Sequence, residues 1–171
     1  MMAESTLQYP DQAPKAVARP QALETILLGG IAVAVLDASN AITFWALYKG
    51  TQPHVIFQSI AAGVLGRDAF SGGMAAAWLG ALLHFLIACG IAAAYYLASL
   101  AKPVLHERPV PCGMMYGAVV YLVMNHVVVP LSRANSPAFI PGWFVANLVG
   151  HIVLVGLPVA LIAHRSATRR R

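Results

Sequence analysis

Six polar side chains that could do chemistry lie inside long apolar stretches of the sequence. They are an acid, two imidazoles and three carboxamides: Asp37, Asn40, His84, Asn125, Asn147 and His151. A carboxyl group in hydrocarbon must be protonated or must pair with a cation such as histidinium, and either state implies a strongly coupled titration. We therefore expect this polar core to bind or relay a proton, an ion or a small solute.

Helical spacing predicts that these side chains meet. Small residues recur every three or four positions on the faces that carry Asp37 and His84, which is typical of closely packed helices. At 1.5 Å per residue, four of the polar groups lie about 14–20 Å from the ends of their apolar stretches, close to the middle of a bilayer. The proton hypothesis requires the Asp37 carboxyl to lie within about 10 Å of His84 or His151, close enough for contact or one bridging water. His126 is rotated by about 100° from Asn125 and is expected to face elsewhere.

Two other functional classes stay open. In the first, the polar groups are only interhelical hydrogen bonds, and the protein is a non-catalytic scaffold or accessory subunit. In the second, His84 and His151 ligate a haem in a redox protein; because the Ala-rich and Gly-rich faces leave little room for a macrocycle, we expect no haem and no other cofactor. The sequence contains no P-loop, HExxH or GxSxG motif and no zinc-type cysteine spacing, so we expect no metal, and the motifs assign no enzymatic activity.

The composition places the polar core in a membrane protein. Of the 171 residues, 59% are apolar and 10% are charged, and the mean hydropathy is +0.71. Soluble proteins have about 25% charged residues. The net charge is +5, but in so apolar a chain the basic excess indicates membrane topology rather than nucleic-acid binding. We expect the lipid bilayer as a partner and no nucleic acid.

Four apolar stretches are long enough to cross about 30 Å of hydrocarbon: residues 26–48, 74–100, 112–131 and 142–163. Residues 53–66 are apolar but too short to cross, so they predict an interfacial or re-entrant helix. Short connections favour antiparallel neighbours. The predicted fold is an all-α integral membrane protein, an antiparallel bundle of four transmembrane helices with one short interfacial or re-entrant helix, in a single membrane domain over residues 23–165.

The flanking segments give the expected orientation. Residues 1–22 predict a disordered cytoplasmic tail, and residues 166–171 a basic cytoplasmic tail. A cleavable signal peptide does not fit, because Asp37 and Asn40 interrupt the first apolar stretch. Eight basic residues fall on the side of both termini and three on the other, which predicts that both termini are cytoplasmic. The GxxxG pair Gly113 and Gly117 can serve packing within the chain or a homo-oligomer, and we expect mainly the former.

Short motifs in the second half of the chain resemble a known family. These are His84-Phe85, the pair Asn125-His126 shortly before Pro130-Leu131, and Gly150-His151 in a last helix with a basic end. They resemble the YagU-like family of small bacterial inner-membrane proteins, over roughly residues 74–165. The resemblance implies a bacterial inner membrane and assigns no activity.

Overall fold

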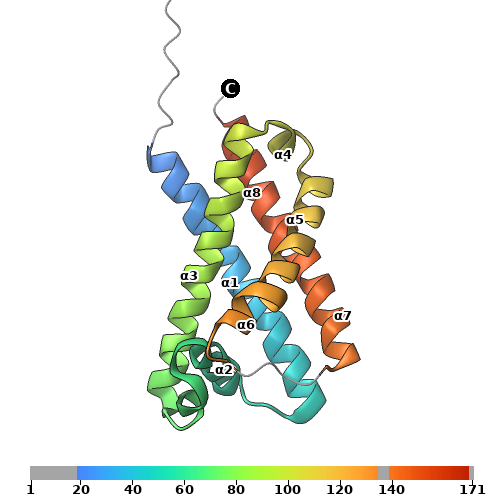
Figure 1. The fold of residues 1–171 in the computed structure, drawn as a ribbon. Helices are drawn as coiled ribbons and strands as arrows, with labels where there is room; N and C mark the ends of the chain where they lie inside the picture. Colours follow the sequence, from blue (N-terminus) through green and yellow to red (C-terminus); the bar gives the residue numbers. More distant parts are fainter. Residues whose placement is uncertain (1–18, 135–138, 170–171) are drawn as a thin grey trace, which may run out of the picture.

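The computed structural model describes residues 19–134 and 139–169, and these residues form helices and no strand. Four long helical segments run along one another, and shorter helices lie at both ends of the bundle (Figure 1). The first two long segments are α1 (Arg19–Lys49) and α3 (Gly73–Ala101). The third comprises α5 (Pro109–Val123), η2 (Met124–Val128) and α6 (Val129–Leu131), and the fourth comprises α7 (Pro141–Gly150), η3 (His151–Gly156) and α8 (Leu157–Thr168).

The predicted fold class is confirmed, because all four segments are long and apolar enough to cross a membrane. The predicted boundaries of the membrane domain differ at both ends. Helix α1 begins at Arg19, within the predicted tail of residues 1–22, and α8 continues to Thr168, beyond the predicted domain end at residue 165. Apolar runs mark only the part of a helix that hydrocarbon surrounds, so polar end turns escape such a prediction. The rest of the two predicted tails lies outside the described residues.

Both ends of the described chain lie at the same end of the bundle. Thr25 Oγ1 and Ser166 Oγ share a hydrogen bond of 2.7 Å, and the Arg169 guanidinium lies 3.6 Å from the Glu24 carboxylate. The short helix α4 (Val104–Glu107) covers this end as well (Figure 1). We call it the α4 end. The return of the chain to its starting side is the result expected from four antiparallel crossings.

The short helix α2 (Pro53–Leu65) lies at the opposite end, which we call the α2 end (Figure 1). It packs directly on α3: Gly80 in α3 has no room for a Cβ, because that atom would overlap the carbonyl group of Phe57. A 3₁₀ turn, η1 (Gly66–Phe70), then leads into α3. Arg133 Nη1 donates to the carbonyl oxygen of Val64 at 3.1 Å, which ties α2 to the chain after α6. The predicted short helix is present, and packing holds it in place.

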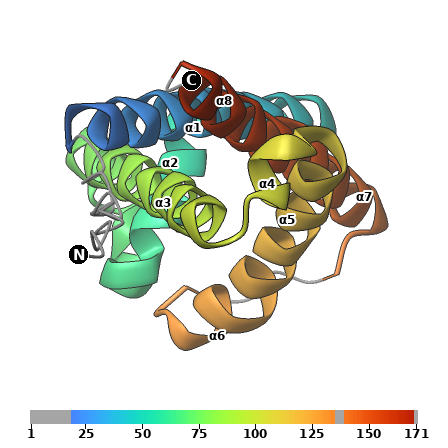
Figure 2. The ribbon, with the colours of Figure 1, turned by 90° about the horizontal axis from the view of Figure 1, so that it is seen from above.

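Small residues bring the long helices into backbone contact. Seen from above, the helices follow the order α3, α1, α8 and α5 around the bundle (Figure 2). A Cβ on Gly30 of α1 would lie 3.0 Å from Cα of Cys89 in α3. A Cβ on Gly113 of α5 would lie 2.9 Å from the carbonyl oxygen of Gly156 in η3. One glycine of the GxxxG pair therefore already packs against the fourth segment of the same chain, which is the use expected from the sequence.

Candidate functional site

Helix α1 carries Asp37 to the middle of the bundle. Val33, one helical turn earlier, is 2% exposed and belongs to the main apolar core, so this face of α1 points inward. The side chain of Asp37 keeps 22% of its surface exposed. The carboxylate is thus inside the bundle without being sealed from its surroundings.

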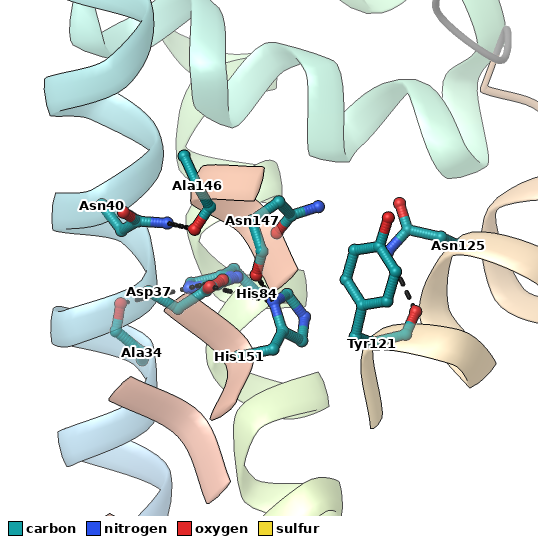
Figure 3. A network of polar contacts seen from close by, with 9 residues as sticks. All are labelled: Ala34, Asp37, Asn40, His84, Tyr121, Asn125, Ala146, Asn147 and His151. Atoms are coloured by element: carbon teal, nitrogen blue, oxygen red, sulfur yellow. Dashed lines mark hydrogen bonds and ion pairs between the residues drawn. The ribbon is translucent and has the colours of Figure 1, made fainter. Parts of the chain in front are cut away.

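Two imidazoles approach the Asp37 carboxylate from two other segments. His84 in α3 places Nε2 at 4.0 Å from Oδ2, and His151 in η3 places Nδ1 at 3.8 Å from Oδ1 (Figure 3). The two imidazole side chains are 13% and 10% exposed. Both distances lie well inside the limit of about 10 Å that the proton hypothesis sets. We call Asp37, His84 and His151 the triad.

The imidazole nitrogens that face Asp37 carry protons. His84 Nε2 lies 3.1 Å from the carbonyl oxygen of Ala34, and His151 Nδ1 lies 2.9 Å from that of Asn147. Because a carbonyl oxygen can only accept, each of these nitrogens must donate. In a neutral imidazole the second ring nitrogen then has a free lone pair. His84 can take up a proton at Nδ1, and His151 at Nε2, without losing its backbone anchor.

A change of helix type accompanies His151. It is the first residue of η3, a π-helical segment of six residues. Pro158 lacks a backbone N–H, and its ring crowds the carbonyl of Leu154, four residues earlier and inside η3. The other π-helical segment, η2, likewise ends two residues before a proline, Pro130. Here the change of helix geometry before Pro158 takes the form of a π segment, which is uncommon and often found at functional sites.

Helix α5 packs against both the ring and the backbone of His151. The Tyr121 ring meets the His151 ring edge-on, with centroids 5.6 Å apart and planes at 84°. One turn earlier, Gly117 lies so close to the His151 carbonyl that a Cβ would overlap its oxygen. Figure 3 shows Tyr121 on the side of His151 that faces away from α1. His151 is therefore held between α1 and α5.

Asn40 links α1 to α7 on the α2 side of the triad. Its Nδ2 donates to the carbonyl oxygen of Ala146 at 3.3 Å. This contact depends on a glycine in the facing helix, because a Cβ on Gly150 would lie 2.5 Å from Asn40 Nδ2. Asn40 thus fixes the distance between the two helices that carry Asp37 and His151.

The other two carboxamides also lie on the α2 side and border the triad. Asn147 is buried, one turn before His151, and anchors the imidazole through its backbone carbonyl. Asn125 donates from Nδ2 to the carbonyl oxygen of Tyr121 at 3.0 Å, within its own helix. Of the six predicted residues, the structure therefore brings the acid and the two imidazoles together and places the three amides beside them.

Sequence reasoning missed three residues of the site. Tyr121 shares a helical face with Asn125 but was not expected to touch an imidazole, and Gly117 and Gly150 had no assigned role at the triad. The four-residue spacing of Gly117, Tyr121 and Asn125 is the signal that could have found the first two. His126 is exposed and donates from Nδ1 to its own helix, as its rotation from Asn125 predicts.

The imidazole nitrogens nearest to Asp37 bear protons and so have no lone pair for a metal. Over residues 19–134 and 139–169, no group of three or more His, Cys, Asp and Glu side chains is arranged to hold a metal ion.

No family model, curated protein or solved structure matches the chain. The features that bear on function are therefore those of the site. They are one acid and two imidazoles at the centre of an apolar helical bundle, with amides on one side.

Proposed function

We propose that this protein is a multi-pass protein of the bacterial inner membrane that reversibly binds a proton at the triad of Asp37, His84 and His151. The α4 end, with both termini, faces the cytoplasm in this proposal, because eight of the eleven basic residues belong to that side. The resemblance to the YagU-like family supports the same membrane. It contributes nothing to the chemistry, which comes from the triad.

The observation that carries the proposal is the way Asp37 is left without a hydrogen bond. Its carboxylate lies 3.8 Å and 4.0 Å from the two imidazole nitrogens, beyond hydrogen-bond distance, and makes no hydrogen bond within the described part of the chain. A structural acid in an apolar bundle would be expected to have short hydrogen bonds. This acid instead has two ionisable neighbours and free acceptor capacity, which is the arrangement of a group that changes its protonation state.

A charge count favours one bound proton. With Asp37 ionised and both imidazoles neutral, the triad carries one negative charge among apolar helices, where an isolated charge is costly. One proton makes the triad neutral, either as a carboxylic acid or as a carboxylate paired with an imidazolium. Unit charges 4 Å apart attract by about 4 kcal/mol at an effective dielectric constant of about 20. The remaining neighbour, Tyr121 of α5, is a phenol that meets His151 by its ring. In this proposal the three groups form one coupled unit that shares a single proton.

The second candidate function is a scaffold or accessory subunit, and the amides favour it. Asn40 and Asn125 use their side chains to bond backbone carbonyl oxygens, which is what interhelical or intrahelical packing groups do. In a scaffold, the ionisation of Asp37 would have no consequence. The two functions therefore differ in what happens when the charge is removed and the shape is kept.

The test compares Asp37→Asn with Asp68→Asn, an exposed acid in η1, as the matched control. Infrared difference spectra of the protein in lipid nanodiscs, recorded between acidic and alkaline buffers, report the protonation of carboxyl groups. We expect a buried carboxyl signal in the parent protein that persists in Asp68→Asn and is lost in Asp37→Asn, while circular dichroism and gel filtration remain unchanged.

Two histidine variants complete the design. His84→Gln should shift the pH at which the Asp37 signal changes, because it removes one member of the coupled unit. His126→Gln removes an exposed histidine and should leave that pH unchanged. If the carboxyl signal does not change with pH in the folded protein, or if it survives in Asp37→Asn, the triad is not a proton-binding site and the scaffold function stands.

A further inference from the structure

The triad has different surroundings on its two sides along the bundle. Each member of the triad has an apolar side chain one helical turn nearer the α4 end. These side chains are Val33 for Asp37, Ala88 for His84 and Val155 for His151. These three side chains are 2%, 0% and 1% exposed and belong to one core cluster. We call them the apolar layer.

The core continues beyond the apolar layer without a polar gap. Ala92 and Val159, a further turn toward the α4 end, are buried in the same cluster. Tyr95 is fully buried there, and its hydroxyl donates to the carbonyl oxygen of Leu105 at 2.8 Å. Close-packed apolar side chains exclude water, so this buried cluster separates the triad from the α4 end in this conformation.

Toward the α2 end the neighbours of the triad are amides and a hydroxyl. Figure 3 shows the side chain of Asn147 pointing toward Asn125 and the Tyr121 hydroxyl, above the level of His151. The Asn147 amide makes no hydrogen bond to any described residue, and no side-chain polar atom within the described ranges is both buried and without a partner. The amide atoms therefore keep a small accessible area although Asn147 as a whole is only 7% exposed, and a water molecule entering from the α2 end would satisfy them. We call Asn40, Asn125 and Asn147 the amide layer.

We propose that the triad exchanges protons with the side of the membrane on which α2 lies, through the amide layer, and that the apolar layer closes it to the other side. This inference rests on the proposed function, because it gives the direction from which the bound proton comes. The exposed part of the Asp37 carboxylate then faces water that enters from the α2 end. In the proposed orientation this is the external side, so the protonation of the triad follows the external pH.

Cysteine accessibility tests the direction. In a background with Cys89→Ala and Cys112→Ala, single cysteines replace Asn147 in the amide layer or Val155 in the apolar layer, two positions on the same segment. A membrane-impermeant methanethiosulfonate reagent is applied to right-side-out and to inverted membrane vesicles. Such reagents need a hydrated thiolate, and buried thiols are inert, so accessibility decides the rate.

Two exposed positions identify the faces. Asp68→Cys marks the α2 end and Arg169→Cys marks the α4 end, because both side chains are exposed. We expect Asn147→Cys to react from the face at which Asp68→Cys reacts and not from the other face. Val155→Cys should react from neither face. Ala88→Cys, a smaller change in the same layer, repeats this result if Val155→Cys does not fold.

Three results would overturn the proposal: reaction of Asn147→Cys from the Arg169→Cys face, reaction of Asn147→Cys from neither face, or reaction of an apolar-layer cysteine from the Arg169→Cys face. Labelling does not depend on the charge of Asp37. Suppose that Asn147→Cys is labelled from one face only and that the Asp37 carboxyl signal does not change with pH. This result would refute the proposed function and leave the water route in place. A pH-dependent carboxyl signal with the wrong labelling pattern would refute only the direction.

Discussion

The backbone contact between α5 and η3 gives the sharpest test of the position of His151, and Gly117→Ala is the substitution that tests it. A Cβ on Gly117 would lie 2.7 Å from Cα of Ile152 and 2.8 Å from the carbonyl carbon of His151. These are backbone atoms, so no side-chain rotation can relieve the contact. The contact with Cα of Ile152 alone requires the two segments to separate by about 0.7 Å to reach the 3.4 Å of an ordinary contact, and the His151 carbonyl oxygen lies closer still. Overpacking of this kind costs about 1–3 kcal/mol.

The matched control is Gly90→Ala, which makes the same chemical change in α3. A Cβ on Gly90 would have no atom within 4 Å. Alanine is favoured over glycine in a helix by up to about 1 kcal/mol, and this gain applies to both variants. We therefore expect the free energy of unfolding to fall by up to about 2 kcal/mol in Gly117→Ala and to stay equal or rise in Gly90→Ala.

Equilibrium unfolding in mixed micelles of a mild detergent and sodium dodecyl sulfate, followed by tryptophan fluorescence, measures the difference. The separation of α5 from η3 also moves the His151 backbone, so Gly117→Ala should alter the pH response of the Asp37 carboxyl signal, whereas Gly90→Ala should not. If Gly117→Ala is as stable as Gly90→Ala, the backbones of α5 and η3 are not in contact and the described position of His151 is wrong.

Three further predictions concern other contacts. Gly150→Ala should displace the Asn40 amide, which would lie 2.5 Å from the new Cβ, and should lower the unfolding midpoint in mixed micelles relative to Gly90→Ala. Tyr116→Phe should cost about 1 kcal/mol in the same assay, because the Tyr116 hydroxyl donates to the carbonyl oxygen of Ile91 at 2.7 Å; an unchanged midpoint would contradict that bond. Arg169→Ala should change the midpoint by less than about 0.5 kcal/mol, since its ion pair is 75% and 57% exposed; a larger loss would show that the pair is not solvated.

The long helices could be predicted because each apolar run is long enough to cross a bilayer and longer than the strands and loops of soluble proteins. The inward positions of Asp37 and His84 could be predicted as well, since both lie on stripes of small residues that must pack closely. Their helix ends could not be placed from hydropathy. The turns around Thr25 and Ser166 are polar and are held by a side-chain hydrogen bond between α1 and α8, a long-range contact that no local pattern reports.

The fine geometry of the site could not be predicted, because it depends on two departures from regular structure. A π segment changes the rotation of every residue that follows it, so ideal helical spacing misplaces residues around His151. The prolines that accompany the π segments are visible in the sequence, but proline alone does not say whether a helix kinks or widens. The partner of Asn125 could not be predicted either, since its amide donates to the carbonyl oxygen of Tyr121 in its own helical segment rather than to another helix.

The hydrogen bonds that hold the two imidazoles in place do not depend on the protonation of Asp37. His84 is held by Ala34 O at 3.1 Å and His151 by Asn147 O at 2.9 Å, and neither bond involves the Asp37 carboxylate. The imidazoles therefore keep their positions whichever group holds the proton. In Asp37→Asn the two anchors remain, and an amide of the same size stands where the carboxylate was. The fold should tolerate this variant, and a loss of proton binding in it can be assigned to the missing charge rather than to a collapsed site.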